Sequence, residues 1–358
     1  MLSKSHLEAT FANKKVFITG HTGFKGTWLA FLLYEIGADV MGFSLPPAEE
    51  QSHFNILGLS EKIKHVIGDV RDESILEKTM NEFQPEFVFH LAAQALVRLS
   101  YSDPTETFST NVMGSVNLLN AVRNCQSIRS LVFVTSDKCY ENNEWLWGYR
   151  EMDRLGGRDP YSASKAAAEG VFSSYVSSYF DQRPSLGAAS ARAGNVVGGG
   201  DWAVDRIIPD CIRAIQSNES ILLRNPWATR PWQHVLEPLS GYLLLSSRLY
   251  QEPKKWGGAW NFGPTVEGFR TVKSVAEVII GHLGKGSIKI VESEEQVHEA
   301  KLLQLNCDKA HQLLGWYPTW NADQTLKVTA SWYQAMINGE DVEKTTRDQI
   351  NEFFEVEP

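Results

Sequence analysis

The feature that most constrains the fold is a series of glycines between an apolar β-rich segment and an apolar helical segment. Residues 15–19 are expected to form a strand and residues 27–33 a buried helix, with Gly20, Gly23 and Gly26 between them. This order suits a dinucleotide pyrophosphate, because the glycines permit a tight turn and let the backbone approach phosphates at the helix N-terminus. The spacing differs from the standard Gly-x-Gly-x-x-Gly. A plain strand-to-helix turn is the alternative, and the flanking segments favour cofactor binding.

Strands and helices alternate up to about residue 195, which predicts an α/β fold with a doubly wound parallel sheet of the Rossmann type. The later strands are expected at residues 39–43, 66–70, 87–94, 131–135 and 186–192. Ligands bind at the carboxyl ends of strands in such a sheet. Small or polar residues follow several of these strands, so the sequence predicts a site along that edge.

The residue after the second strand bears on the choice between NAD and NADP. An acidic residue about 20 positions past the glycine loop would hold the adenosine ribose of NAD, and Ser44 occupies that place. No Arg follows to bind a 2′-phosphate, so NAD is predicted. Asp69, at the end of the third strand, has two open interpretations: it accepts hydrogen bonds from the adenine amino group, or it is the acid at the start of the helix expected over residues 72–80.

A second motif places a Tyr and a Lys one helical turn apart. Tyr161 and Lys165 follow Pro160, which suits a first helical turn, and residues four apart share a helix face. A neighbouring ammonium lowers a phenol pKa from its usual value of about 10. Tyr161 would then take a proton from an alcohol as hydride leaves the same carbon. The same spacing occurs in ordinary amphipathic helices, and the glycine loop favours the functional interpretation.

Four segments together resemble the extended short-chain dehydrogenase/reductase family: residues 20–26, 90–94, 135–138 and 161–165. The resemblance implies an NAD-binding Rossmann domain over residues 1–195. Residues 196–358 would form a smaller, mainly substrate-binding domain, with segments near 235–265 returning to the first. The residues predicted to bind the cofactor are Gly20, His21, Thr22, Gly23, Phe24, Lys25, Gly26, Ser44, Asp69, Val70, Leu91, Ala92, Ala93, Gln94, Asn111, Thr135, Tyr161, Lys165 and Arg192.

Within that family the chain is most similar to the branch of the CDP-glucose 4,6-dehydratases, on residues 42–47, 135–142 and 191–202. This resemblance implies an internal redox reaction that converts CDP-glucose to CDP-4-keto-6-deoxyglucose and water and restores NAD in each turnover. Tyr161 would deprotonate the C4 hydroxyl with the support of Lys165, Ser136 would hydrogen-bond the C4 oxygen, and Asp137 would protonate the leaving C6 hydroxyl if burial or a neighbouring charge raises its pKa.

The residue after Asp137 departs from the dTDP-glucose relatives, in which an acid at this place acts as the C5 base. Lys138 stands here, so either Lys138 is the base or it stabilises the enolate electrostatically. A surface turn is the alternative for the pair. Arg230 matches the place where family members hold the diphosphate, and Arg presents a fork of donors suited to phosphate. Asn195 and Arg206 complete the predicted substrate contacts together with Ser136, and Arg192 is a further candidate.

Three rival functions share this fold. A sugar-nucleotide 4-epimerase would use Tyr161 and Lys165 without needing Asp137 and Lys138. A catalytically silent cofactor-sensing protein would not need the Tyr and Lys pair, which this chain keeps. An NADPH-dependent reductase would need the Arg that is missing after the second strand. The dehydratase is therefore favoured, in a deoxysugar pathway for surface polysaccharide.

Net charge, apolar segments and cysteine spacing indicate which partners and which cellular location to expect. The net charge of −9 opposes nonspecific nucleic-acid binding. The sequence has no apolar stretch of the roughly 18 residues that a membrane span needs, and residues 1–13 lack a signal-peptide hydrophobic region. The four cysteines are scattered without a metal-ligand pattern, so no metal and a cytoplasmic location are expected. Helices expected at residues 104–122 and 160–180 resemble a dimer contact of the family, which implies a homodimer or homotetramer.

Overall fold

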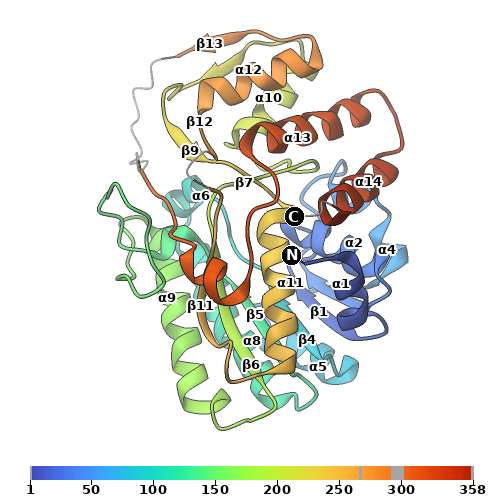
Figure 1. The fold of residues 1–358 in the computed structure, drawn as a ribbon, viewed down its shortest axis with the longest axis vertical. Helices are drawn as coiled ribbons and strands as arrows, with labels where there is room; N and C mark the ends of the chain where they lie inside the picture. Colours follow the sequence, from blue (N-terminus) through green and yellow to red (C-terminus); the bar gives the residue numbers. More distant parts are fainter. Residues whose placement is uncertain (1, 266–267, 292–301, 356–358) are drawn as a thin grey trace.

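The computed structural model describes residues 2–265, 268–291 and 302–355 (Figure 1). A seven-stranded sheet forms the larger lobe, and its strand order is β11-β6-β5-β4-β1-β2-β3. Every neighbouring pair is parallel. The order runs outward from β1 on one side and β4 on the other, which is the predicted doubly wound arrangement. The strands are β1 (Lys15–Thr19), β2 (Asp39–Ser44), β3 (Lys64–Ile67), β4 (Phe87–His90), β5 (Ser130–Val134), β6 (Gly187–Ala193) and β11 (Gly258–Phe262).

Helices cover both faces of this sheet, so its strands are apolar on both sides. The helices α2 (Phe24–Glu35) and α11 (Leu236–Gln251) cover one face, and α5 (Glu73–Phe83), α8 (Gly114–Asn124) and α9 (Pro160–Tyr175) lie over the other (Figure 1). Successive strand residues point to opposite faces. In β1, Val16 and Ile18 accordingly belong to one hydrophobic core and Phe17 to the other. Burial on both faces explains why these strands form continuous apolar runs.

Capping side chains and prolines fix where the helices near the site begin. The side chain of Asp159 accepts a hydrogen bond from the Ser162 amide (2.9 Å), and Pro160 occupies the first helical position of α9. Asp103 and Pro104 start α7 (Pro104–Phe108) in the same way. A π-helical segment, η1 (Ser109–Met113), joins α7 to α8, and another, η3 (Val176–Phe180), extends α9. The helices expected at 104–122 and 160–180 are thus present with these interruptions.

A smaller lobe lies beyond the carboxyl ends of the strands, in the upper part of Figure 1. It contains α10 (Ile207–Gln216), α12 (Val272–Leu283), α13 (Ala322–Ile337) and three strand pairs. The pairs are β8 (Ile221–Leu223) with β13 (Ile288–Ile290), β9 (Thr229–Pro231) with β12 (Phe269–Thr271), and β7 (Val196–Val197) with β10 (Gln233–His234). Between β10 and β12 the chain returns to the large lobe as α11 and β11. The domain division at residue 195 stays a prediction.

The remaining elements are short or lie at the ends of the chain. They are α1 (Lys4–Phe11), α3 (His53–Ile56), α4 (Leu59–Lys62), α6 (Val97–Ser102), η2 (Asp137–Cys139), η5 (Ala310–Leu314) and α14 (Val342–Glu355). Among the described residues, no helix combines the length and the apolar character needed to cross a bilayer. All four cysteines are buried as free thiols.

Candidate active site

A cavity of about 1620 Å³ lies at the carboxyl edge of the sheet and extends under the smaller lobe. It is lined by the glycine loop, by the residues after β2, β4, β5 and β6, by the start of α9 and by segments of the smaller lobe. Pockets for a single small ligand usually measure roughly 300–1,000 Å³. This cavity therefore has room for a dinucleotide and a second ligand together.

The glycine loop gives the cavity a wall of exposed backbone. Gly20 has a positive φ of 78°, and a Cβ there would lie 2.7 Å from the Ala92 amide nitrogen. A Cβ on Gly26 would clash with the carbonyl oxygen of Gly20, so side chains are excluded at both positions. Gly23 is the N-cap of α2 and offers no side-chain cap. The first amides of α2 are thus left available to an anion at the helix N-terminus, which fits a pyrophosphate.

The cavity lining includes the two residues considered for the adenosine. Ser44 lines it and shares a hydrogen bond of 2.8 Å with Thr22. Asp69 also lines it, and hydrogen bonds from Arg71 lower the pKa of its carboxyl. Asp72 caps α5 by accepting from the Ile75 amide at 3.1 Å. Interpreting Asp69 as the acid at the helix start is therefore wrong, and the adenine contact stays a prediction.

Three residues predicted to bind the cofactor are absent from the cavity lining. The His21 side chain is buried and lies 2.7 Å from His65, between Nε2 of one ring and Nδ1 of the other. It packs over Gly42, where any Cβ would overlap the imidazole. The His21 side chain therefore does not line the cavity, although its loop neighbours Gly20 and Thr22 do, and the cofactor contact of His21 stays a prediction.

Asn111 is buried in η1 and shapes the loop after β4. Its Oδ1 accepts from the Gln94 amide (2.9 Å), and its Nδ2 donates to Ser164 Oγ (2.9 Å). The alternative of a solvated polar position is wrong, because Asn111 is buried. Its side chain does not line the cavity, and the direct cofactor contact stays a prediction. Asn111 acts through Gln94, which does line the cavity.

The side chain of Arg192 lies elsewhere than the sequence prediction placed it. Its Nε and Nη2 donate to the two carboxylate oxygens of Glu169 at 2.9 and 2.8 Å, and both side chains are only 4% exposed. Alternation along β6 explains the placement: Ala191 and Ala193 point to the core around α11, whereas Arg192 faces α9. The guanidinium is held in this buried pair and does not line the cavity.

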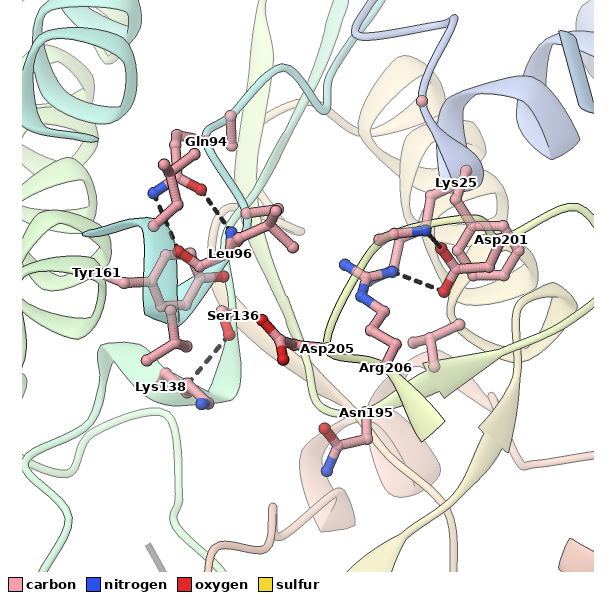
Figure 2. Close-up of a pocket in the computed structure, with 18 of the residues that line it drawn as sticks. Lys25, Gln94, Leu96, Ser136, Lys138, Tyr161, Asn195, Asp201, Asp205 and Arg206 are labelled. Atoms are coloured by element: carbon pink, nitrogen blue, oxygen red, sulfur yellow. Dashed lines mark hydrogen bonds and ion pairs between the residues drawn. The ribbon is translucent and has the colours of Figure 1, made fainter. Parts of the chain in front are cut away.

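The five predicted catalytic residues come together at one wall of the cavity. Ser136, Asp137 and Lys138 follow β5, and Tyr161 and Lys165 approach from α9. Ser136 Oγ donates to Asp137 Oδ1 at 2.9 Å and accepts from the Lys138 amide at 3.2 Å. Figure 2 shows the Tyr161 phenol beside Ser136 and Lys138, facing the wall that carries Asn195 and Arg206. Lys165 Nζ lies 6.0 Å from the centroid of the Tyr161 ring.

Burial dominates the electrostatics of this wall. Burial raises the pKa of Tyr161 to about 12, opposed by a hydrogen bond with Ser136 and by the charge of Arg206. Sequence reasoning expected Lys165 to lower this pKa; the direction is the opposite because desolvation of the phenolate outweighs the nearby cations. Burial also lowers the pKa of Lys165 to about 8. It raises the pKa of Asp137, against the opposing effects of Lys138, Ser136 and Lys25, which is the direction expected for a carboxyl group that acts as an acid.

The opposite wall contains the predicted substrate contacts Asn195, Arg206 and Arg230. Arg206 is ion-paired with Asp201, with 2.8 Å between Nη1 and Oδ2.

Arg98 and Arg224 also line the cavity, and each is ion-paired with Asp205. Sequence reasoning missed these two, because no local pattern marks them. It also missed Glu169, whose signal was available: Glu169 is one helical turn past Lys165 on the same face of α9.

Comparisons with known proteins agree with this geometry. Residues 17–329 match the family model of GDP-mannose 4,6 dehydratase. The chain belongs to this family. A CDP-glucose 4,6-dehydratase from Salmonella typhimurium is 47% identical over 345 residues, which cover 95% of this chain and 96% of the relative. The predicted resemblance to the extended short-chain dehydrogenases/reductases is confirmed.

Solved structures with low identity share the fold. An epimerase from Methanothermobacter thermautotrophicus has a TM-score of 0.81 at 22% identity, over 95% of this chain and 97% of that one. A dTDP-glucose 4,6-dehydratase from Bacillus anthracis, in complex with NAD, has a TM-score of 0.74 at 22% identity, over 93% and 99% of the two chains. The predicted Rossmann-type fold is thereby confirmed.

Proposed function

We propose that this protein is an NAD-dependent lyase, a CDP-glucose 4,6-dehydratase, which converts CDP-glucose to CDP-4-keto-6-deoxyglucose and water. The observation that carries the proposal is the placement of Asp137, a buried acid with a raised pKa, next to the Tyr161 phenol in the large cavity. The oxidation of an alcohol by NAD needs a base, here the phenol, but no additional acid. A buried acid beside it suits the loss of a hydroxyl from a neighbouring carbon. The relative that is 47% identical is named for the same activity, CDP-glucose 4,6-dehydratase.

The cofactor site fits NAD. The backbone of the glycine loop and the uncapped start of α2 would hold the pyrophosphate, and Ser44 and Asp69 would border the adenosine. Leu91, Ala92 and Ala93 leave space at the end of β4 for the rest of the molecule. When bound, NAD supplies a reversible hydride acceptor.

The residues of the chain handle the protons. Tyr161 takes the proton of the C4 hydroxyl when it is in its phenolate form, which Ser136 and the charge of Arg206 favour against burial. Ser136 hydrogen-bonds the C4 oxygen. Once C4 is a ketone, the C5 proton is acidic, and Asp137 protonates the C6 hydroxyl so that it leaves as water. Lys138, which lines the cavity next to Asp137, either takes the C5 proton or stabilises the enolate by its charge.

The opposite wall would hold the nucleotide. Arg230 and Arg206 would bind the diphosphate and Asn195 the sugar, all from the segment after β6. Arg206 would keep its ion pair with Asp201, which fixes the guanidinium in place. Residues 1–195 would thus bind mainly the cofactor and residues 196–358 mainly the sugar nucleotide. We further propose a homodimer or homotetramer assembled through α7, α8 and α9.

Mass spectrometry tests the function. Purified protein is incubated with NAD and, in separate reactions, with CDP-, dTDP-, GDP- or UDP-glucose. Loss of one water from CDP-glucose, with much less from the others, is expected. Unchanged masses throughout would contradict a dehydratase. Epimerisation, which conserves mass, is the runner-up, since an epimerase shares the fold, and would then be sought by a stereochemical readout.

A further inference from the structure

Two hydroxyl groups lie together where the glycine loop meets the end of β2. The Gly20 amide donates to the Phe43 carbonyl at 2.9 Å, which joins the loop to this strand. Thr22 of the loop and Ser44 of β2 are hydrogen-bonded to each other, and both line the cavity. A dinucleotide with its pyrophosphate on the glycine loop places its adenosine ribose at this strand end. The 2′-oxygen of that ribose carries a hydrogen in NAD and a phosphate in NADP.

The hydroxyl of Thr22 makes two contacts but has only one hydrogen. Its Oγ1 lies 2.9 Å from the Leu45 carbonyl oxygen and 2.8 Å from Ser44 Oγ. A carbonyl oxygen can only accept, so the Thr22 hydrogen is directed to Leu45. The hydrogen between the two hydroxyls then belongs to Ser44, because this is the one arrangement in which both contacts are hydrogen bonds.

This assignment leaves Ser44 Oγ as an acceptor toward the cavity. Ser44 is 8% exposed, and its single hydrogen is engaged by Thr22. Its remaining lone pairs can accept a hydrogen bond from a ribose 2′-hydroxyl, which is the role of the acidic residue at this place in other dinucleotide sites. A 2′-phosphate brings negative charge and acceptor oxygens, so it would meet lone pairs where it needs a donor.

The charges around Ser44 act in the same direction. Among the described residues 44–49 and 68–70, the charged side chains that line the cavity are those of Glu49 and Asp69. Arg71, the next basic residue along the chain, directs its guanidinium to Asp69 and Glu106. A 2′-phosphate would therefore approach two carboxylates in this part of the cavity.

We propose, on the basis of the proposed function, that Thr22 is a specificity-determining residue for NAD over NADP. By holding the Ser44 hydrogen, Thr22 makes Ser44 an uncharged acceptor in the place of the missing acid. The competing arrangement directs the Thr22 hydrogen to Ser44. The Leu45 carbonyl would then lose this partner, and the Ser44 hydrogen would be free to bind a 2′-phosphate.

Calorimetric titration of NAD and of NADP into the full-length protein, freed of bound nucleotide, distinguishes the two arrangements. The wild type is expected to bind NAD more tightly than NADP. Thr22→Val keeps the size of the side chain and removes the acceptor of the Ser44 hydrogen, which can then turn to the ligand. The ratio of the NADP to the NAD dissociation constant should fall by about three- to tenfold, the effect of one hydrogen bond. Thr22→Ser keeps the hydroxyl and should keep the wild-type ratio.

A second substitution separates cofactor specificity from the structure of the loop. In protein that also carries Ser44→Ala, Thr22→Val should leave the ratio unchanged, because the hydrogen that it would free is gone. Three results would overturn the proposal: an unchanged ratio in Thr22→Val alone, the same fall with Ser44→Ala present, or wild-type protein that binds NADP as tightly as NAD. Failure of the proposed function is a different result, in which the preference for NAD is observed but CDP-glucose loses no water.

Discussion

The buried pair of Arg192 and Glu169 leads to a quantitative prediction. Arg192→Met keeps the volume of the side chain and removes its charge. The variant loses two hydrogen bonds to Glu169 (2.9 and 2.8 Å), one to the Tyr140 hydroxyl (2.8 Å) and one to the Glu151 carbonyl (3.1 Å). Because both partners are only 4% exposed, water cannot replace these bonds. Removing one member of such a pair strands a buried charge, which costs about 3–5 kcal/mol.

Denaturant unfolding measures this cost as a lower midpoint at an unchanged slope. Adding Glu169→Gln to Arg192→Met removes the stranded charge and should recover much of the loss. Lys344→Met is the matched control: it removes an exposed pair with Asp348 on α14, and a change below about 0.5 kcal/mol is expected. The reasoning is refuted if Arg192→Met unfolds at the wild-type midpoint and binds NAD less tightly, because Arg192 would then belong to the cofactor site.

Three further predictions concern the site itself. Burial lowers the pKa of Lys165 to about 8 from 10.5, so the contribution of Lys165 to the free energy of unfolding rises with pH. Lys165→Met should therefore stabilise the unliganded protein at neutral pH by about 3 kcal/mol, and the gain should shrink as the pH nears 10.5. Unfolding experiments across this pH range measure the gain, and a gain independent of pH would contradict the argument. Asp137→Asn should slow water loss from CDP-glucose by about 10²–10⁴-fold, whereas Asp348→Asn, on exposed α14, should not; a fully active Asp137→Asn would exclude Asp137 as the acid. Gly26→Ala should abolish NAD binding in calorimetry, because the new Cβ would clash with Gly20. Gly170→Ala is the control and should bind NAD normally, because a Cβ there meets nothing within 4 Å. Tight NAD binding by Gly26→Ala would disprove the glycine-loop argument.

The strands of the large sheet were predictable because burial on both faces demands uninterrupted apolar segments. Residues 15–19 form β1 as expected, and the residues after β5 lie at the cavity because carboxyl ends of parallel strands share one edge. Such arguments depend on chain order alone.

Side-chain direction and long-range pairing were not predictable in the same way. Arg192 precedes the strand end by one residue, and alternation turns it toward Glu169 on α9. Asp205 brings together Arg98 and Arg224 from distant segments, which no spacing reveals. The pKa of Tyr161 depends on its burial, which the sequence does not show.

The central claim is an internal transfer of hydride from C4 to C6 coupled to the loss of water. CDP-glucose carrying deuterium at C4 tests it most directly when the protein acts on it with unlabelled NAD and the product is examined by NMR. The account predicts a 4-keto-6-deoxy product with the deuterium in its C6 methyl group. A dehydrated product without deuterium at C6, or recovery of the label at C4 of an undehydrated sugar, would contradict it.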